Sequence, residues 1–272
     1  MNLNLSISFY FTFDGRFDYL LTDLQKKRTF MKKALFLTTA LVSLGLSVQA
    51  ATYSGNGNSG FGGPIGLGSL TLTDNGTTVS GTVNKGPNGF NDVLVLYIDS
   101  MAGGFADTSG FADGGDGLRK AISGFDGGGN RSLLTFTGGF TPDYAIALGP
   151  ASDSFGGLWQ LANGGGNSLN FVSSVNLNPT GANNSPTYTF SFNVSQIGLS
   201  PGSGATFAML GTYIADSGYR SDEAVAGNDV GTQGWNPFLQ TASVSYTIVP
   251  EPSTVALLGL GLAAVIGARR RK

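Results

Sequence analysis

Cysteine and histidine are both absent from this chain of 272 residues. Without cysteine no disulfide bond can form, so the folded state has to be stabilised by burial of a core. The chain also lacks thiol nucleophiles, imidazole bases and the usual protein ligands of zinc and copper. These absences exclude the enzymes and metal sites that depend on such groups.

Positive charge is scarce in the central part of the chain. Residues 51–249 hold five Lys and Arg residues against 13 Asp and Glu residues, a net charge of 5 minus 13, or −8. An acidic surface repels the phosphate backbone, which argues against nucleic acid as a partner.

Glutamate is almost missing from the same segment, which holds Glu223 beside 12 aspartates. Glycoside hydrolysis needs two carboxylates whose pKa values differ. Asp222 and Glu223 are sequence neighbours, so in a strand they point to opposite faces. No other pair stands out, and we expect no catalytic residue and no enzymatic activity. An envelope enzyme that acts on glycosides is the alternative.

Helix signals are nearly absent, whereas strand patterns are frequent. The segments 187–194 and 241–248 alternate apolar and polar residues, which is typical of half-buried strands. The segment 93–98 is continuously apolar and short, which indicates a central strand buried on both faces. Single helical turns are expected only over 118–123 and 195–199.

Glycine separates these segments, with 38 of the 43 glycines between positions 51 and 249. About ten short strands with Gly, Asn, Asp and Pro between them predict an all-β fold, an antiparallel β-sandwich of jelly-roll type, with a barrel as the alternative. We expect 55–68 to be a loose lead-in or an edge, and 227–237 to be a long loop carrying Trp235. The remaining expected strands are 69–73, 77–83, 132–137, 144–148, 158–162, 168–175 and 205–214.

The end of the chain combines three features. A Pro-Glu-Pro triplet is followed by an uncharged run over 254–268 and then by four cations at 269–272. An apolar run can enter a bilayer while a basic cluster stays on the cytoplasmic side. This pattern predicts a single membrane-spanning helix over 254–268, although its 15 residues cover only about 22 Å of a core of about 30 Å.

This arrangement resembles the PEP-CTERM sorting signal of Gram-negative bacteria, which an exosortase recognises. The resemblance implies export, an intermediate anchored in the inner membrane, cleavage near the triplet, and delivery to the cell surface or the medium. It also implies an association with exopolysaccharide and biofilm. The residues that carry it are Pro250, Glu251, Pro252, Arg269, Arg270, Arg271 and Lys272.

A second targeting pattern lies near the start of the chain. A charged segment at 31–33, with Lys32 and Lys33, precedes an apolar stretch over 34–48. Small or tolerated residues follow up to Ala50, as in a secretory signal peptide. We expect a signal peptide over 31–50, cut by signal peptidase between Ala50 and Ala51, with membrane anchoring by 34–48 as the alternative. Residues 1–30 are interpreted as an over-extended start. The body is then one domain over 51–249, followed by the sorting signal at 250–272.

Two surface features of the body suggest ligands. Asp107, Asp113 and Asp116 lie in a glycine-rich stretch and can converge on Ca²⁺. They lack EF-hand spacing, however, and a solvated, turn-rich loop is the favoured interpretation. Trp235 can stack on a sugar ring while Asn236 donates to a hydroxyl. Apart from Ca²⁺, no cofactor is expected.

The body faintly resembles β-sandwich modules of the DOMON and carbohydrate-binding type, through Asp92 to Asp99 with its Ile-Asp ending, Thr141 to Leu148 and Ser221 to Ala224. The resemblance carries no binding residue and only favours a sandwich. The expected function is a non-catalytic surface or matrix protein with a polysaccharide as possible partner. A calcium-dependent adhesin is a further alternative.

Overall fold

The computed structural model describes residues 49–161, 169–250 and 261. The segment 1–30, the predicted signal peptide up to residue 48, the basic cluster at 269–272 and all of 254–268 except Gly261 lie outside these residues. Among the described residues, no helix is both long and apolar enough to cross a bilayer.

The smaller of two sheets contains four antiparallel strands in the order β1-β2-β3-β9. Three of them follow one another along the chain as two hairpins, and the fourth comes from a distant segment. Their bounds are β1 Gln49–Ser54, β2 Ser69–Asp74, β3 Thr78–Asn84 and β9 Thr187–Asn193.

The larger sheet has nine strands, of which seven form the path β12-β13-β10-β4-β6-β7-β8. In addition β11 pairs with β10, and the short β5 pairs with β13 in parallel. The bounds are β4 Val93–Asp99, β5 Leu134–Thr135, β6 Tyr144–Gly149, β7 Phe155–Leu161, β8 Leu169–Ser174, β10 Thr206–Ile214, β11 Arg220–Val225, β12 Gly227–Gly231 and β13 Phe238–Thr247.

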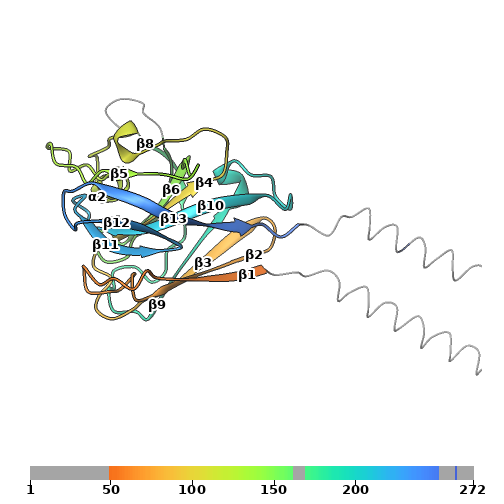
Figure 1. Ribbon diagram of the computed structural model, residues 1–272. Helices are drawn as coiled ribbons and strands as arrows, with labels where there is room; N and C mark the ends of the chain where they lie inside the picture. The colour runs from red at the N-terminus through yellow and green to blue at the C-terminus, as the bar shows by residue number, and fades with distance from the viewer. Residues whose placement is uncertain (1–48, 162–168, 251–260, 262–272) are drawn as a thin grey trace, which may run out of the picture. The chain divides into compact units, whose positions relative to one another are not determined.

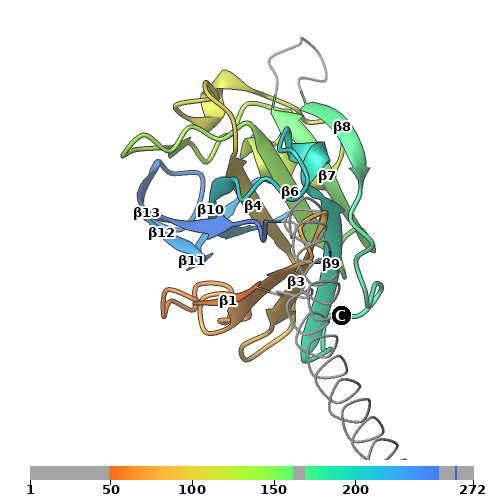
Figure 2. The same ribbon diagram turned by 90° about the vertical axis from the view of Figure 1, so that its right-hand side faces the viewer.

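The two sheets lie face to face, as Figures 1 and 2 show, and enclose the main apolar core. Alternate residues of β9, namely Tyr188, Phe190 and Phe192, point into this core together with Leu94 and Leu96 of β4. The predicted all-β fold of packed antiparallel strands is therefore confirmed. A jelly roll divides eight strands between two Greek keys, whereas these sheets hold four and nine strands.

A second core lies on the outer face of the larger sheet. Val93, Val95 and Tyr97 of β4 point to this side and pack against the helix α2 Gly117–Ser123 and the loops around it. The central strand is thus buried on both faces, as its unbroken apolar run predicts. Both expected single turns also form, as α2 and as the 3₁₀ helix η2 Val194–Ile197.

The glycine-rich segment 55–68 is not a loose lead-in, contrary to expectation. The fully buried carboxylate of Glu223 accepts hydrogen bonds from four backbone N–H groups of this segment, those of Phe61, Gly63, Ile65 and Gly66, at 2.7–3.0 Å. The close approach needs glycine, because a Cβ on Gly66 would lie 2.2 Å from a backbone oxygen. The predicted long loop over 227–237 is likewise partly ordered, since its first half forms β12.

Candidate functional site

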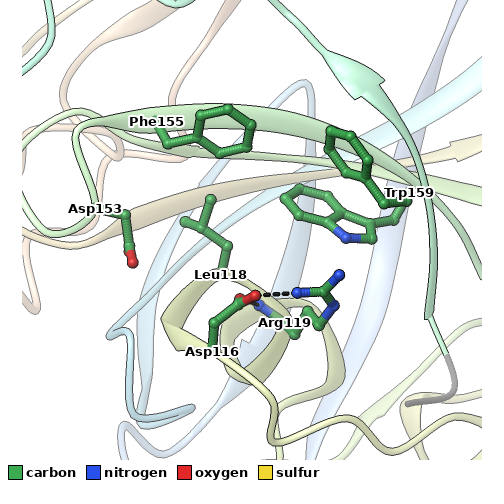
Figure 3. Close-up of a pocket in the computed structure, with 7 residues that line it drawn as sticks. Asp116, Leu118, Arg119, Asp153, Phe155 and Trp159 are labelled. Atoms are coloured by element: carbon green, nitrogen blue, oxygen red, sulfur yellow. Dashed lines mark hydrogen bonds and ion pairs between the residues drawn. The ribbon is translucent and has the colours of Figure 1, made fainter.

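A cavity of about 340 Å³ lies where α2 meets the strands β7 and β8 (Figure 3). Its apolar side comes from the two strands and its polar side comes from α2 and the turn before β7. The lining residues are Asp116, Leu118, Arg119, Asp153, Phe155, Trp159 and Phe171.

Three aromatic rings form the apolar side. Phe155 and Trp159 are four residues apart in β7 and therefore share a face of the strand, and Trp159 pairs with Phe171 of β8. The ring of Phe171 lies 5.6 Å from that of Trp159 and 6.2 Å from that of Phe155. Gly157 lies between Phe155 and Trp159 in β7. A Cβ at this position would lie 2.5 Å from the Trp159 ring, so any larger residue would displace that ring.

The rings differ in how much surface they show. Phe155 is 38% exposed and Phe171 is 50% exposed, whereas Trp159 is only 2% exposed. Trp159 therefore belongs to the second core. Its indole Nε1 is buried without a hydrogen-bond partner among the described residues.

The start of α2 supplies the charged groups. Asp116 is the N-cap of the helix, because its side chain accepts the backbone N–H of Arg119 at 2.8 Å. The Arg119 guanidinium pairs with this same carboxylate, lies 3.4 Å from the buried Asp113 through Nε, and stands 5.8 Å from the centre of the Trp159 ring. Figure 3 shows Arg119 reaching from α2 across to Trp159. Two carboxylates thus balance this one cation.

Asp153 is the carboxylate of the cavity without a cationic partner among the described residues. Its side chain accepts a hydrogen bond from the Ser152 hydroxyl at 3.1 Å. Desolvation raises the pKa of Asp153, the negative charges of Asp216 and Asp116 raise it further, and the hydrogen bond from Ser152 opposes both. The cavity therefore combines an apolar floor with an excess of negative charge.

The three aspartates predicted to bind calcium have separate structural roles. Asp107 caps the 3₁₀ helix η1 Thr108–Gly110 by accepting the backbone N–H of Ser109. Asp113 accepts the N–H groups of Gly115 and Leu169, and Asp116 caps α2. Within residues 49–161 and 169–250, no group of three or more acidic side chains is placed to hold a metal ion. Calcium binding stays a prediction without a converging ligand set to support it.

Trp235 and Asn236 lie in the turn between β12 and β13, outside the lining of the cavity. Trp235 is half-buried and packs edge-on against Tyr219, with ring centres 5.7 Å apart at 89°. The exposed Asn236 donates to the Gln233 carbonyl at 3.2 Å. Both residues have local structural contacts, and their proposed contact with a sugar stays a prediction.

The two predicted processing sites lie at the ends of the folded body. Ala50 and Ala51 are inside β1, where they pair with Thr73 and Leu72. Val249 and Pro250 follow β13, and Glu251, Pro252, Arg269, Arg270, Arg271 and Lys272 lie outside the described residues.

Comparison with known families decides the nature of this end of the chain. Residues 249–272 match the PEP-CTERM protein-sorting motif. The chain carries a PEP-CTERM sorting signal. This PEP-CTERM signal indicates export, processing by an exosortase and sorting to the cell surface. No curated protein and no solved structure matches the chain, so the resemblance of the body to DOMON-type modules is unconfirmed.

Proposed function

We propose that the body is a non-catalytic surface or matrix protein that binds a polysaccharide at the cavity between α2, β7 and β8. The observation that carries the proposal is the pair of exposed rings, Phe155 and Phe171, placed beside an unpaired carboxylate, Asp153. A sugar ring has an apolar face of C–H groups, which packs on aromatic side chains. Its hydroxyl groups donate hydrogen bonds to acceptors such as carboxylates. This cavity offers both within one ligand-sized space.

The charges suggest which polysaccharide would bind. Arg119 is balanced by Asp113 and Asp116, so Asp153 and the nearby Asp216 leave the cavity with a negative potential. A neutral sugar or one with a free amino group would be accepted, whereas a uronic acid would be repelled.

The absence of catalysis is supported by what the carboxylates already do. Glu223 uses both oxygens on four backbone N–H groups, and Asp222 accepts the N–H of Gly60 at 3.0 Å. Asp116 is held by the helix it caps and by Arg119. In this proposal the protein passes through an inner-membrane intermediate in a Gram-negative cell and then associates with exopolysaccharide and biofilm.

Protein recovered from the cell surface tests this function on an array of neutral, amino and uronic polysaccharides. Phe155→Ala and Phe171→Ala should each weaken binding about tenfold, the equivalent of about 1–2 kcal/mol, with little change in melting temperature because both rings are exposed. Leu239→Ala is the matched control, since this residue of β13 is 45% exposed and lies away from the cavity in the same sheet.

A reducing-sugar assay on the same samples separates binding from hydrolysis. Stable binding without new reducing ends supports the proposal. New reducing ends, or binding that is unchanged in both phenylalanine variants, would contradict it.

A further inference from the structure

One buried side chain of β2 contacts the end of the last strand, β13, beside the start of the first strand, β1. Asp74, at the end of β2, is 4% exposed and pairs in the sheet with Gln49 at the start of β1. Its Oδ1 accepts the backbone N–H of Val249 at 2.9 Å, and its Oδ2 accepts the hydroxyl of Tyr246 at 2.6 Å. The Tyr246 hydroxyl also lies 3.3 Å from the Gln49 carbonyl oxygen. The start of β1 and the end of β13 thus lie on the same side of the body (Figure 1).

Val249 is also the first residue of the sorting motif, so the motif begins inside the fold. Ile248 is fully buried and donates its N–H to the Ala205 carbonyl at 2.8 Å, and Val249 is only 6% exposed. The Pro250 ring lies against Gly204, where an added Cβ would be 3.2 Å from it. No spacer therefore separates the packed body from the motif.

A processing enzyme has to reach the backbone on both sides of the bond that it cuts. Enzymes and receptors that recognise extended peptides do so through main-chain hydrogen bonds. In the folded body the backbone N–H groups of Ile248 and Val249 already donate to Ala205 and Asp74. These residues must leave the body by local opening before an enzyme can bind them.

We propose that Asp74 is a positioning residue of the sorting reaction, which sets how often the start of the motif leaves the body and so limits the rate of tail removal. The carboxylate suits this role because it also accepts the N–H of Gly76 at 2.8 Å and is therefore held in place by its own hairpin. Burial raises the pKa of Tyr246, so its hydroxyl stays protonated and donates to Asp74.

The same corner contains the predicted signal-peptidase site. A cut after Ala50 would remove Gln49 and with it the carbonyl that lies near Tyr246. In the mature form the Tyr246 hydroxyl then keeps its hydrogen bond to Asp74, which also accepts the N–H of Val249.

The test follows the full-length protein in a cell that contains its exosortase. Asp74→Ala should raise the rate of tail removal about tenfold, because loss of a charge-assisted hydrogen bond to a buried backbone group favours the open form by about that factor. Tyr246→Phe should give a smaller increase, since only the hydroxyl is lost. Pulse-chase labelling with mass determination of precursor and product measures both rates.

Two control variants separate this role from general destabilisation. Asn75→Ala removes side-chain hydrogen bonds to Thr77 and Thr78 in the same hairpin without touching Val249. Phe90→Leu weakens the core near Tyr188 and Tyr213, away from the junction. Neither control should speed tail removal, even where it lowers the melting temperature as much as Asp74→Ala does.

Amide hydrogen exchange at Ile248 and Val249 gives a readout that does not depend on the exosortase. We expect faster exchange at these two amides in Asp74→Ala and Tyr246→Phe. The Gly76 amide, which also loses its acceptor in Asp74→Ala, should exchange faster in that variant alone, and other protected amides should be unchanged. Unchanged or slower tail removal in variants whose junction exchanges faster would overturn it, as would equal acceleration by Phe90→Leu.

Discussion

At the scale of single residues, the most unusual group of the body is a buried acid beside a buried base. Arg220 is fully buried, donates to Thr212 Oγ1 at 2.6 Å and stands 5.7 Å from the centre of the Phe238 ring. Asp229 is 1% exposed, and neither of its oxygens has a hydrogen-bond partner among the described residues. Desolvation raises the pKa of Asp229 to about 6, although the charge of Arg220 opposes the rise and that of Asp222 adds to it.

This shift predicts a pH-dependent stability. In the unfolded chain an aspartate ionises near pH 4, so between about pH 4 and pH 6 the folded state holds the extra proton and stability falls as pH rises. The loss should amount to about 3 kcal/mol and be complete above about pH 7. The side chain of Asp229→Asn cannot titrate. The melting temperature of this variant, minus that of the wild type, should therefore increase as pH rises from 4.5 to 7. A constant difference across that range would show that Asp229 does not carry the effect.

At the scale of elements, the buried Glu223 of β11 holds a segment that could not fold alone. The segment 55–68 is too rich in glycine to form its own core, and its order comes from four N–H groups directed at one carboxylate. A carboxylate can accept all four hydrogen bonds, because it has two oxygens with two lone pairs each. A strand and a loop far apart in sequence therefore depend on each other.

Glu223→Gln tests this dependence. The amide keeps one oxygen and places an NH₂ group against two backbone donors, so we expect a loss of about 3 kcal/mol in the free energy of unfolding. Proteolysis should then begin within 55–68. Asp222→Asn is the matched control in the neighbouring position. The half-exposed side chain of Asp222 accepts a single backbone N–H, that of Gly60. Equal melting temperatures for Glu223→Gln and the wild type would refute this role.

At the scale of the whole molecule, the folded body is followed by a tail that matches the sorting motif. We predict that the basic cluster at 269–272 fixes the orientation of the tail in the membrane through the positive-inside rule. Replacement of all four cations by Ser should therefore block tail removal and surface delivery, as seen by mass determination of cell-associated protein. In the control variant the three arginines of the cluster are replaced by Lys, which keeps the positive charge. Normal maturation of the Ser variant would show that the charges are not needed.

Much of this architecture was readable from local patterns. The alternation over 187–194 and the unbroken apolar run over 93–98 predicted the burial that is observed, because strand periodicity reports directly on which faces are covered. The strands β11 and β12 were missed, since their polar and glycine-rich residues show no such periodicity. Both strands form because the neighbouring β10 and β13 present open edges to them.

The candidate site was less predictable. The association of Phe155 and Trp159 with Asp153, Arg119 and Phe171 depends on how α2 docks on the sheet. The acidic stretch suggested a shared ligand, whereas Asp107, Asp113 and Asp116 each satisfy a different local group.

The sequence by itself determined the sorting signal, the all-β class and the absence of thiol and imidazole chemistry, because these follow from composition, short motifs and strand period. The tertiary structure decided that the glycine-rich segment is held by Glu223, that aromatic rings and carboxylates meet in one cavity, and that Asp74 joins both ends of the body. The reason is physical. These contacts join residues that are distant in the chain, and their partners are backbone groups and faces that exist only once the sheets have packed.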